Sequence, residues 1–538
     1  MNSFAVAATL IGCIGLLVYI YVNRKYKYFA QRNIPFVKPV FFLGNGGPIL
    51  LKKRDLFENL KDIYNAHPKS KVVGMFEFLQ PVLMIRDPDL IKLVAVKDFD
   101  HFADRMPIFT GPDVKDPGGD SILPNVLIAL RGQKWRHMRA TLSPAYTGSK
   151  MRQMFPMVFG CAESAVRCMM DETKAGVRVD YDMKEVFARF SNDVIASVAF
   201  GVQVDSFREP ENEFFVKGKG LLDFGKLTTI AKALLFRFSP ETARRLKVEI
   251  FNTELLEAFK KMITDNMNQR EAQGIVRNDM IHMLMQARKA TEQQWTDEVD
   301  VKDAGFATVE ESSVGKKAHS RLWTDNELIA QCFLFFIGAF ETIGNALMFL
   351  SYELALHPAI QQRLYEEIVS TEESLNGKPL SYEVLQKMQY LDMVVSESLR
   401  LWAPNPFVDR YCEKDYVYDD GQGGRATIEK GVLVWFPIIA LHHDPQYYPD
   451  PYKFDPERFS EANRSKINPA AYLPFGVGPR NCMGSRLALL MMKSMVFYLM
   501  KHCAFEPSEK CGIPLKLVKT IIGPVVEGGV WLSLKPRN

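Results

Sequence analysis

A glycine-rich loop near the carboxyl end presents one cysteine just before an apolar helix, and this feature constrains the fold most. The loop spans residues 475–484 and reads FGVGPRNCMG. Its three glycines allow tight bends and close approach to a flat cofactor, and Pro479 stiffens the bend. Amide groups that open the following helix can hold a sulfur anion. The loop is therefore suited to offer the Cys482 thiolate to a haem iron, where thiolate ligation favours O–O bond cleavage. The alternative is a buried structural cysteine.

The other cysteines do not suggest a competing metal site or a disulfide framework. The chain has eight cysteines. They are far apart and contain no C-x-x-C pair, so neither zinc binding nor a disulfide scaffold is indicated. None of the nine histidines occurs in a comparable glycine loop, which disfavours histidine as the axial ligand. These observations predict a reducing, cytosol-facing protein body.

Composition excludes several classes of function. The 538 residues are 47% hydrophobic and 24% charged, which is typical of a globular protein with a large core. A formal net charge of +4 is small for this length and gives no reason to expect nucleic-acid binding. No G-x-G-x-x-G fingerprint opens a strand–helix unit, so we expect no nicotinamide or flavin site in this chain.

The amino terminus predicts a membrane anchor. Residues 4–22 carry no charge, and at about 1.5 Å per residue a helix of this length spans roughly a hydrocarbon core. Basic residues follow the apolar run and none precedes it, which predicts that the body stays in the cytosol. We therefore expect a transmembrane signal-anchor at 1–23, a basic, proline-bearing hinge at 24–49 and a catalytic domain at 50–538. A cleaved signal peptide and a buried core helix are the alternatives.

Hydrophobic spacing predicts a mainly α fold with small β-sheets. Long stretches with helical apolar spacing occupy residues 155–171, 245–267, 326–357 and 383–402, whereas short β-rich runs occupy Val72–Phe76 and Gly431–Pro437. Residues 291–320 are polar and predict a solvated loop between two helices. Residues 221–240 mix apolar and basic side chains, so they fit either a segment that dips into a membrane or an ordinary packed helix.

A second pattern lies in the middle of the apolar stretch 326–357. There an acid and a hydroxyl, Glu341 and Thr342, follow the small pair Gly338 and Ala339. Small residues allow a flat ligand to approach the helix, and a threonine bonded to the preceding turn can open a gap for dioxygen and water. A core helix with a back-bonded threonine is the plainer interpretation.

These patterns together resemble the cytochrome P450 monooxygenases. Phe475, Gly478, Arg480 and Cys482 match the cysteine-loop signature of that family, and residues 337–342 resemble its oxygen-activating helix. In the family, the acid and threonine at the positions of Glu341 and Thr342 deliver protons for oxygen activation. The chain departs from the pattern at Ala339, where glycine is usual, and at Ile343, where threonine or serine is frequent.

Further residues acquire roles through the same resemblance. The E-x-x-R pair Glu397 and Arg400, with Arg458 downstream, implies a structural triad beneath the haem. Trp135, Arg139, Arg410 and Arg480 are implied to hold the two haem carboxylates by charge-assisted hydrogen bonds, with Phe475 in the same cofactor site. His442 also fits a family position, although a packing histidine is the simpler interpretation.

The resemblance covers nearly the whole chain and implies a single large, triangular prism with one haem b. Residues 142–151 look like the microsomal, insect-type detoxification branch of the family. The implied activity inserts one oxygen atom of O2 into a lipophilic substrate. Electrons would come from an NADPH-dependent reductase in the endoplasmic reticulum membrane, with cytochrome b5 as an optional second donor. The reductase is expected to dock near Lys134, Arg136 and Arg139.

The substrate is open at this point. Expected pocket walls are residues 105–130, the stretch before Thr342, Pro404–Phe407 and Ile521–Val526, which are largely apolar. They fit xenobiotics, and they fit hormones or pheromones equally well. A haem-thiolate isomerase or a peroxide-consuming enzyme would need no reductase, and a haem sensor would need no catalysis. The pair Glu341 and Thr342 argues against these alternatives.

Overall fold

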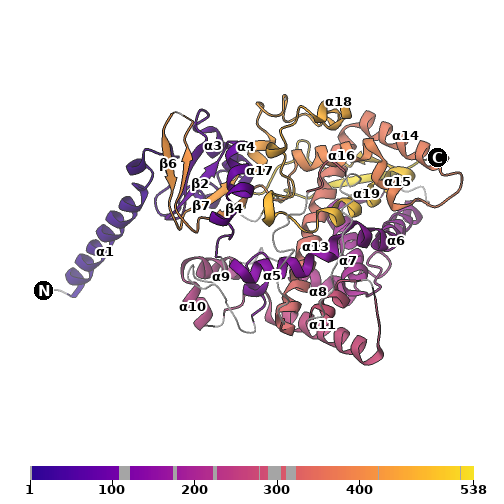
Figure 1. Cartoon of the computed structure of the whole chain (residues 1–538), viewed down its shortest axis with the longest axis horizontal. Helices are drawn as coiled ribbons and strands as arrows, with labels where there is room; N and C mark the ends of the chain where they lie inside the picture. Colours follow the sequence, from indigo (N-terminus) through magenta and orange to yellow (C-terminus); the bar gives the residue numbers. More distant parts are fainter. Residues whose placement is uncertain are drawn as a thin grey trace.

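The computed structural model describes residues 3–107, 121–173, 179–221, 227–246, 248–277, 279–288, 305–309, 323–421, 423–520 and 523–537. Most of the described chain is helical (Figure 1). The helices are α1 (Ser3–Tyr26), α2 (Gly47–Leu50), α3 (Leu56–Asn65), α4 (Pro88–Lys92), α5 (Gly132–Leu142), α6 (Gly148–Thr173), α7 (Met183–Phe200), α8 (Glu213–Leu221), α9 (Leu227–Phe238), α10 (Pro240–Arg245), α11 (Thr253–Gln273), α12 (Met280–Arg288), α13 (Asp325–Leu356), α14 (Pro358–Ser374), α15 (Tyr382–Lys387), α16 (Gln389–Leu401), α17 (Ile438–His442), α18 (Glu461–Arg464) and α19 (Ser485–His502).

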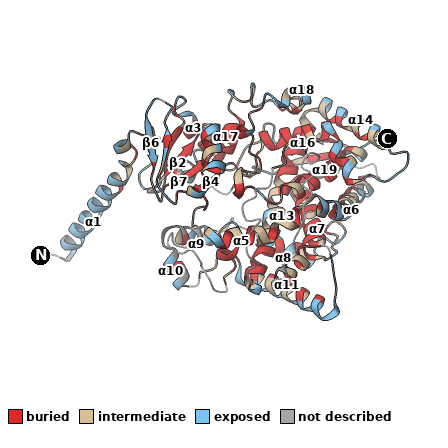
Figure 2. Ribbon diagram, viewed as in Figure 1, coloured by how far each residue is buried: buried red, intermediate tan, exposed pale blue. Residues whose placement is uncertain are grey.

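Helix α13 is the central element of the helical part. Thr324 and Glu327 form a capping box at its start, and Pro358 opens the next helix directly after it. The helix packs along α7, and α19 packs along α6. Most residues of α13 between these ends are buried, as are those of α16 and α19 (Figure 2). This long core helix positions one wall of the site described below.

The strands form small sheets, as the sequence predicts. They are β1 (Val72–Glu77), β2 (Gln80–Ile85), β3 (Asp180–Asp182), β4 (Val408–Tyr411), β5 (Tyr416–Asp419), β6 (Arg425–Ile428), β7 (Leu433–Phe436), β8 (Cys503–Pro507) and β9 (Trp531–Pro536). The largest sheet has the order β1-β2-β7-β4, in which only β2 and β7 run parallel. It lies with α3 on the side of the molecule from which α1 projects (Figure 1). The prediction of a mainly α fold with small β-sheets is confirmed.

Several predicted helix boundaries differ from the structure, and in two cases capping contacts explain the difference. The stretch 383–402 is divided between α15 and α16, because Met388 adopts an extended conformation. The Glu367 carboxylate accepts hydrogen bonds from the backbone N–H groups of Tyr390 and Leu391 and so starts a new helix. The helix predicted from residue 245 begins at Thr253, where the Asn252 side chain caps it. Both starts depend on capping contacts that apolar spacing does not reveal.

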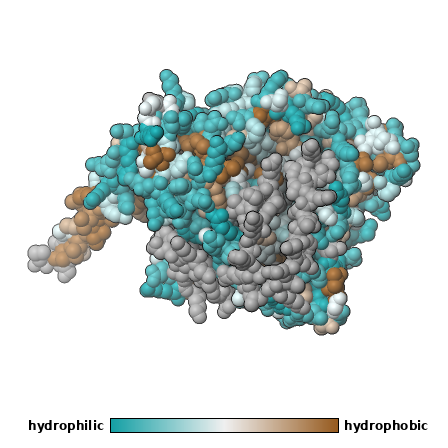
Figure 3. Space-filling model, in the orientation of Figure 1, coloured by the Kyte–Doolittle hydropathy of each residue, from teal (hydrophilic) through white to brown (hydrophobic). Residues whose placement is uncertain are grey.

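The N-terminal helix α1 projects away from the body with exposed apolar side chains (Figures 1 and 3). Among the described residues, two helical stretches are apolar enough by length and composition to cross a membrane: the N-terminal one and α13. Helix α13 is a largely buried core helix, whereas the N-terminal one is exposed.

The segment after α1 is tied to the body. Arg32 makes paired hydrogen bonds of 2.8 and 2.9 Å to the Glu429 carboxylate, and the Tyr28 hydroxyl donates to the same group at 2.9 Å. The Phe29 ring is fully buried beside β1. Bidentate arginine pairs are geometrically restrictive. These contacts therefore fix the direction in which α1 leaves the body.

Part of the segment predicted as a solvated loop, residues 291–320, is packed against the protein core. Residues 305–309 are described, and among them Ala307 is buried while Phe306 packs against other aromatic rings. The remaining residues of the predicted loop lie outside the described ones. In the 221–240 segment, Phe236 is buried and Leu234 and Leu235 are half-buried, and residues 222–226 lie outside the described residues.

Candidate functional site

The cysteine loop adopts the tight conformation that its glycines predict. Gly476 and Gly478 have φ values of 75° and 72°, a region that favours glycine. A Cβ atom on Gly478 would lie 2.0 Å from the carbonyl oxygen of Ala95, so no larger residue fits there. The Cys482 N–H donates to the Phe475 carbonyl at 2.8 Å, which closes the loop. Helix α19 then begins at Ser485.

The Cys482 thiol faces a cavity of about 330 Å³. Desolvation by the surrounding protein raises the pKa of the thiol. The Gly484 N–H and the positive charges of Arg139 and Arg105 oppose that rise. Amide groups and cations are the features that stabilise a thiolate. The sulfur is therefore exposed to the cavity and lies near one amide group and two positive charges that favour its anion.

Helix α13 forms the wall of the same cavity opposite the cysteine loop. Gly338, Ala339, Thr342 and Ile343 line it. The Thr342 hydroxyl donates a hydrogen bond to the Gly338 carbonyl one turn earlier. A Cβ atom on Gly338 would meet nothing within 4 Å. Thr342 and Cys482 therefore line the same cavity. The small residues Gly338 and Ala339, one turn before Thr342, line it as well.

The Glu341 side chain has a different environment from Thr342. Its carboxylate forms a 3.1 Å ion pair with Lys184 of α7, and the Asn345 amide donates to it at 3.4 Å. The Glu341 side chain is 41% exposed, so its carboxylate also reaches solvent. Glu341 is absent from the described residues that line the cavity. A proton relayed by Glu341 would therefore have to move from the solvent-facing side of α13 to Thr342 at the cavity wall.

Two predicted cofactor residues, Trp135 and Arg139, lie on α5 beside the cysteine loop. The Arg139 guanidinium donates to the Asn481 carbonyl at 2.8 Å and to the Asn481 side-chain oxygen at 2.6 Å. Trp135 is buried, and the Arg480 guanidinium carbon lies 3.9 Å from its ring centroid. Both residues line the cavity together with Arg480 and Phe475. The structure therefore brings four of the predicted cofactor residues to Cys482.

Arg480 is largely engaged by protein groups. Its Nε donates to the Ala103 carbonyl and its Nη2 to the Leu130 carbonyl, both at 2.8 Å. The same Nη2 lies 3.1 Å from an Asp104 carboxylate oxygen. These bonds tie the cysteine loop to Ala103, Asp104 and Leu130. Arg480 hence joins two walls of the cavity in addition to lining it.

Arg410 and Arg105 complete the group of cations. Arg410 is fully buried behind the cysteine loop and is absent from the described residues that line the cavity, and its Nη2 donates to the Val477 carbonyl at 2.9 Å. Burial and the neighbouring Arg105 cation lower the pKa of Arg410, against the opposing effect of Asp409. Its Nε has no hydrogen-bond partner within the part of the chain that the structure describes. The sequence did not single out Arg105, which lines the cavity and binds Asp409 at 3.0 Å.

These residues fit a haem group. Three arginines line the cavity, Arg105, Arg139 and Arg480, and the described lining contains no acidic side chain. An unpartnered buried Nε on Arg410 and excess positive charge suit the two carboxylates of haem. The thiol and the small residues of α13 suit the two faces of a flat ring.

The predicted structural triad is formed. Arg400 donates to both Glu397 carboxylate oxygens, at 2.7 and 2.8 Å, and Arg458 lies 3.4 Å from one of them. Glu397 and Arg400 are completely buried. Arg400 also donates to the carbonyls of His442 and Pro451, at 2.7 and 2.8 Å. The triad joins α16 to the segment that precedes the cysteine loop.

His442 packs inside the protein rather than reaching the cavity. Its Nδ1 lies 3.1 Å from the Arg400 carbonyl, and its Nε2 accepts from the Leu473 N–H at 2.9 Å. One nitrogen therefore donates and the other accepts, which is the neutral ring. Burial lowers the pKa of His442 well below its usual range, which agrees with that state.

The predicted pocket walls are formed in part. Leu127 and Ile128 from the first wall, Leu334 and Phe335 before Thr342, and Pro404 and Asn405 all line the cavity. The stretch 521–526 makes no described contribution to the lining. Residues 521 and 522 lie outside the described residues, and Val526 is buried in the hydrophobic core.

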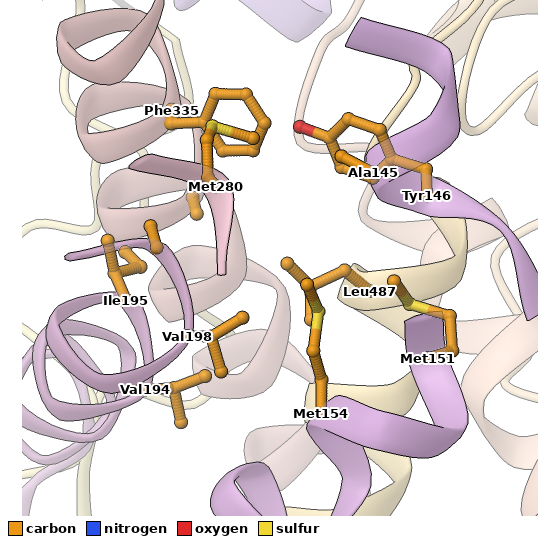
Figure 4. Close-up of a pocket in the computed structure, with 12 residues that line it drawn as sticks. Ala145, Tyr146, Met151, Met154, Val194, Ile195, Val198, Met280, Phe335 and Leu487 are labelled. Atoms are coloured by element: carbon orange, nitrogen blue, oxygen red, sulfur yellow. The ribbon is translucent and has the colours of Figure 1, made fainter. Parts of the chain in front are cut away.

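A second, smaller cavity of about 20 Å³ adjoins the first (Figure 4). Its surface is entirely apolar, and the side chains that Figure 4 labels around it include Met151, Met154 and Val194. Tyr146, Phe335, Ala339 and Leu487 line both cavities. The Tyr146 and Phe335 rings stack with centroids 5.3 Å apart. The second cavity is too small for a drug-sized ligand, so the larger cavity is the candidate site.

The predicted reductase-docking cluster is wrong in two of its three residues. Lys134 is buried and forms a 2.7 Å ion pair with Glu327 of α13, and Arg139 is buried against Asn481. Only Arg136 is partly exposed, and it pairs with Asp100 at 2.7 Å. A helix places neighbouring residues on different faces, so a run of basic letters need not form one basic surface.

Comparison with known proteins agrees with this site. The family model described as Cytochrome P450 matches residues 34–525. "Probable cytochrome P450 9f2" of Drosophila melanogaster is 41% identical over 99% of this chain and 98% of its own length. "Cytochrome P450 9e2" of Blattella germanica is 41% identical over 98% of this chain and 97% of its own length. "Cytochrome P450 6k1" of Blattella germanica is 35% identical over 96% and 93%.

The matched residues include the cysteine loop, helix α13 and the triad of Glu397, Arg400 and Arg458. These relatives are insect proteins, so the expected resemblance to an insect branch is confirmed. Proteins of this family bind haem b and are monooxygenases. A single cavity lined by Cys482, Thr342 and the arginines, and a family match over most of the length, lead to one conclusion: the chain belongs to the cytochrome P450 family of haem-dependent monooxygenases.

Proposed function

We propose that this enzyme inserts one oxygen atom of O2 into a lipophilic substrate, using electrons that a separate reductase takes from NADPH. The observation that carries the proposal is the placement of Thr342 and Cys482 on one largely apolar cavity. Bound haem would supply the activation of O2, which thiolate ligation favours. Cys482 Sγ would ligate the iron. Arg105, Arg139, Arg410 and Arg480 would hold the carboxylates, with Trp135 and Phe475 beside them.

The protein residues would control protons and water around that chemistry. Thr342 Oγ1 can hold a proton donor at the cavity wall, because its own hydrogen is directed to the Gly338 carbonyl. The Glu341 carboxylate contacts both Lys184 and solvent, so it would supply protons from outside. Ile343 fills the next position with an aliphatic group and is buried. Thr342 is therefore the hydroxyl of this turn on which proton delivery would depend.

The lipophilic substrate is inferred from the cavity wall. Leu127, Ile128, Leu334, Phe335 and Ile438 form an apolar surface on it. Transfer of apolar area from water contributes about 25 cal/mol per Å², so such a surface favours lipophilic ligands. We propose xenobiotic detoxification as the physiological role, with hormone or pheromone metabolism as the alternative. A metabolite screen with the reconstituted enzyme distinguishes them.

Replacement of Thr342 by alanine tests the proposal directly. The variant is expected to keep the spectrum of a thiolate-ligated haem and to consume NADPH through the reductase, but to release hydrogen peroxide in place of product. Losing a positioned proton donor costs a factor of about 100 to 10,000 in the affected step. Product and hydrogen peroxide formed per NADPH are measured together.

Thr342→Ser is the matched control, because serine keeps the hydroxyl and should retain most of the coupling. Unchanged coupling in Thr342→Ala would remove the proposed role of Thr342 and favour a peroxide-consuming or isomerase activity. Turnover without any reductase would point to the same alternatives.

We also propose that α1 anchors the chain in the endoplasmic reticulum membrane with the body in the cytosol. The support is the exposed, apolar surface of α1 and the basic residues Arg24 and Lys25 in its last turn. In this proposal residues 1–23 are the anchor, 24–49 the connection and 50–538 the catalytic domain. The reductase, and cytochrome b5 as an optional second donor, would share the same membrane.

Protease protection tests the orientation of the body. Protease added to intact microsomes is expected to digest the body and to leave a short protected fragment that contains α1. Samples opened with detergent provide the control, because the protected fragment should then disappear. Full protection of the body in intact microsomes would show the opposite orientation.

A further inference from the structure

Residues 305–309 occupy a slot formed by α16, α19 and the segment before the cysteine loop. We call these five residues the strap. Ala307 is buried within the main hydrophobic core, and Phe306 packs against that core. The predicted activity uses none of these residues. Their contacts nevertheless lead to Cys482.

The first contact of the strap is with an ion pair whose lysine is buried. Lys493 of α19 is fully buried and lies 2.9 Å from the Asp392 carboxylate of α16. Its ammonium also donates to the Gln386 side chain at 3.2 Å. Gly305 lies directly on this pair with φ of +92°, and a Cβ atom there would be 2.2 Å from Asp392 Oδ1. Only glycine fits this position, both by conformation and by space.

The second contact is made by Phe306. Its backbone N–H donates to the other Asp392 carboxylate oxygen at 2.9 Å. Its ring lies 5.0 Å from the Phe459 ring and 5.4 Å from the Tyr472 ring, measured between centroids. Aromatic pairs at such separations contribute favourable energy beyond the area that they bury. The strap therefore holds the Tyr472 ring from one side.

Tyr472 connects the strap to the cysteine loop. Its hydroxyl donates to the Ser396 carbonyl of α16 at 2.8 Å. The next residue, Leu473, donates its N–H to His442 at 2.9 Å, and its carbonyl accepts from the Gly476 N–H at 3.0 Å. The loop closes through the bond from Cys482 N–H to the Phe475 carbonyl at 2.8 Å. A continuous series of contacts thus runs from Phe306 to Cys482.

We propose that the strap positions the cysteine loop, so that Phe306 and Gly305 keep Cys482 in the geometry of a thiolate ligand. Phe306 is a positioning residue, because it acts through Tyr472 and touches neither substrate nor haem ligand. The inference rests on the proposed role of Cys482. When the strap leaves its slot, Tyr472 loses one ring partner and the loop gains freedom to lose thiolate ligation.

The test uses two variants of the full-length, haem-loaded protein that release the strap differently. Phe306→Ala removes the ring, and Gly305→Ala forces the backbone off the Asp392–Lys493 pair. The readout is the rate at which the ferrous–carbon monoxide complex loses its red-shifted, thiolate-type Soret band during mild warming. Phe306→Ala is expected to lose the band faster by a factor of roughly three to ten, which corresponds to loss of aromatic pair contacts. Gly305→Ala is also expected to lose the band faster than the unmodified protein.

Matched controls separate positioning from general stability. Phe214→Ala removes another half-buried phenylalanine with two ring partners, and Gly377→Ala adds a methyl group at a glycine with a similar φ of +80°, where nothing lies within 4 Å. Phe306→Tyr should restore the rate of the unmodified protein. The unfolding midpoint by far-UV circular dichroism is recorded for each protein. Band loss in the strap variants should occur at temperatures where the helical signal is still native.

Band loss that only parallels unfolding, or that is equal in Phe306→Ala and Phe214→Ala, would overturn the inference and leave Cys482 as the ligand. Absence of a thiolate-type band in the unmodified protein would instead overturn the role of Cys482, and the inference with it.

Discussion

Replacement of Cys482 by alanine is expected to abolish the red-shifted Soret band of the ferrous–carbon monoxide complex, or to yield protein without haem. The band requires a thiolate on the iron, and Cys482 is the cysteine that lines the larger cavity in the described part of the chain. Its loop supplies the Gly484 N–H, and Arg139 and Arg105 from other segments supply positive charges, all of which oppose the raised pKa of the thiol. An alanine methyl group offers no ligand atom at this position. The absorption difference spectrum measures the result.

Cys503→Ala is the control for this change. Unlike Cys482, Cys503 is buried in the hydrophobic core, and burial raises the pKa of its thiol to about 12. A neutral, buried thiol behaves as a small apolar group. We therefore expect Cys503→Ala to keep the full thiolate-type band with a modest loss of stability. Retention of that band in Cys482→Ala would contradict the assignment of the ligand.

The cysteine loop was predictable because its constraints are local. A bend with φ near 75° at Gly476 and Gly478 needs glycine, and the helix that follows is encoded by its own apolar spacing. The same holds for Thr342, because a bond from a hydroxyl to the carbonyl four residues earlier lies within one helix. The sequence pattern and the structural contact coincide in both cases.

Contacts between distant segments were not predictable from spacing. Arg105 lines the cavity because the Asp409 carboxylate of β4 holds it, and these residues are about 300 positions apart. Asn481 binds Arg139 across a similar separation. Only the fold brings such partners together. Two signals in the sequence could have pointed to these residues. Asn481 directly precedes Cys482, and Arg105 is the first residue of a predicted pocket wall.

Charge could not be assigned to surface or interior from the sequence alone. Lys134 belongs to a basic run on α5, yet Glu327 at the start of α13 neutralises it inside the protein. A lysine is rarely buried unless an acidic side chain pairs with it, and the sequence alone does not show which distant acid will do so. The strap is a similar case, since Gly305 and Phe306 lie in a polar stretch but contact the Asp392–Lys493 ion pair, whose lysine is buried.

Replacement of Arg400 by alanine is expected to destabilise the fold by about 3–5 kcal/mol, because it leaves the Glu397 carboxylate buried without its main partner. Burial already raises the pKa of Glu397, and the Arg400 hydrogen bonds are the largest effect that opposes this rise. The change also removes donors from the carbonyls of His442 and Pro451. Domains are typically stable by about 5–15 kcal/mol, so this loss is a large fraction. Chemical denaturation followed by circular dichroism measures it.

The sequence contains its own control for this prediction. Glu461 and Arg464 repeat the E-x-x-R spacing on α18, but both residues are exposed. Exposed charges contribute about 0–1 kcal/mol at most, so Arg464→Ala should leave stability nearly unchanged. Arg400→Lys should still be strongly destabilising, because lysine cannot supply the planar fork that binds both Glu397 oxygens and two carbonyls. If Arg400→Ala and Arg464→Ala lower the free energy of unfolding equally, the prediction is wrong. The buried Glu397–Arg400 pair would then contribute no more to stability than the exposed pair with the same spacing.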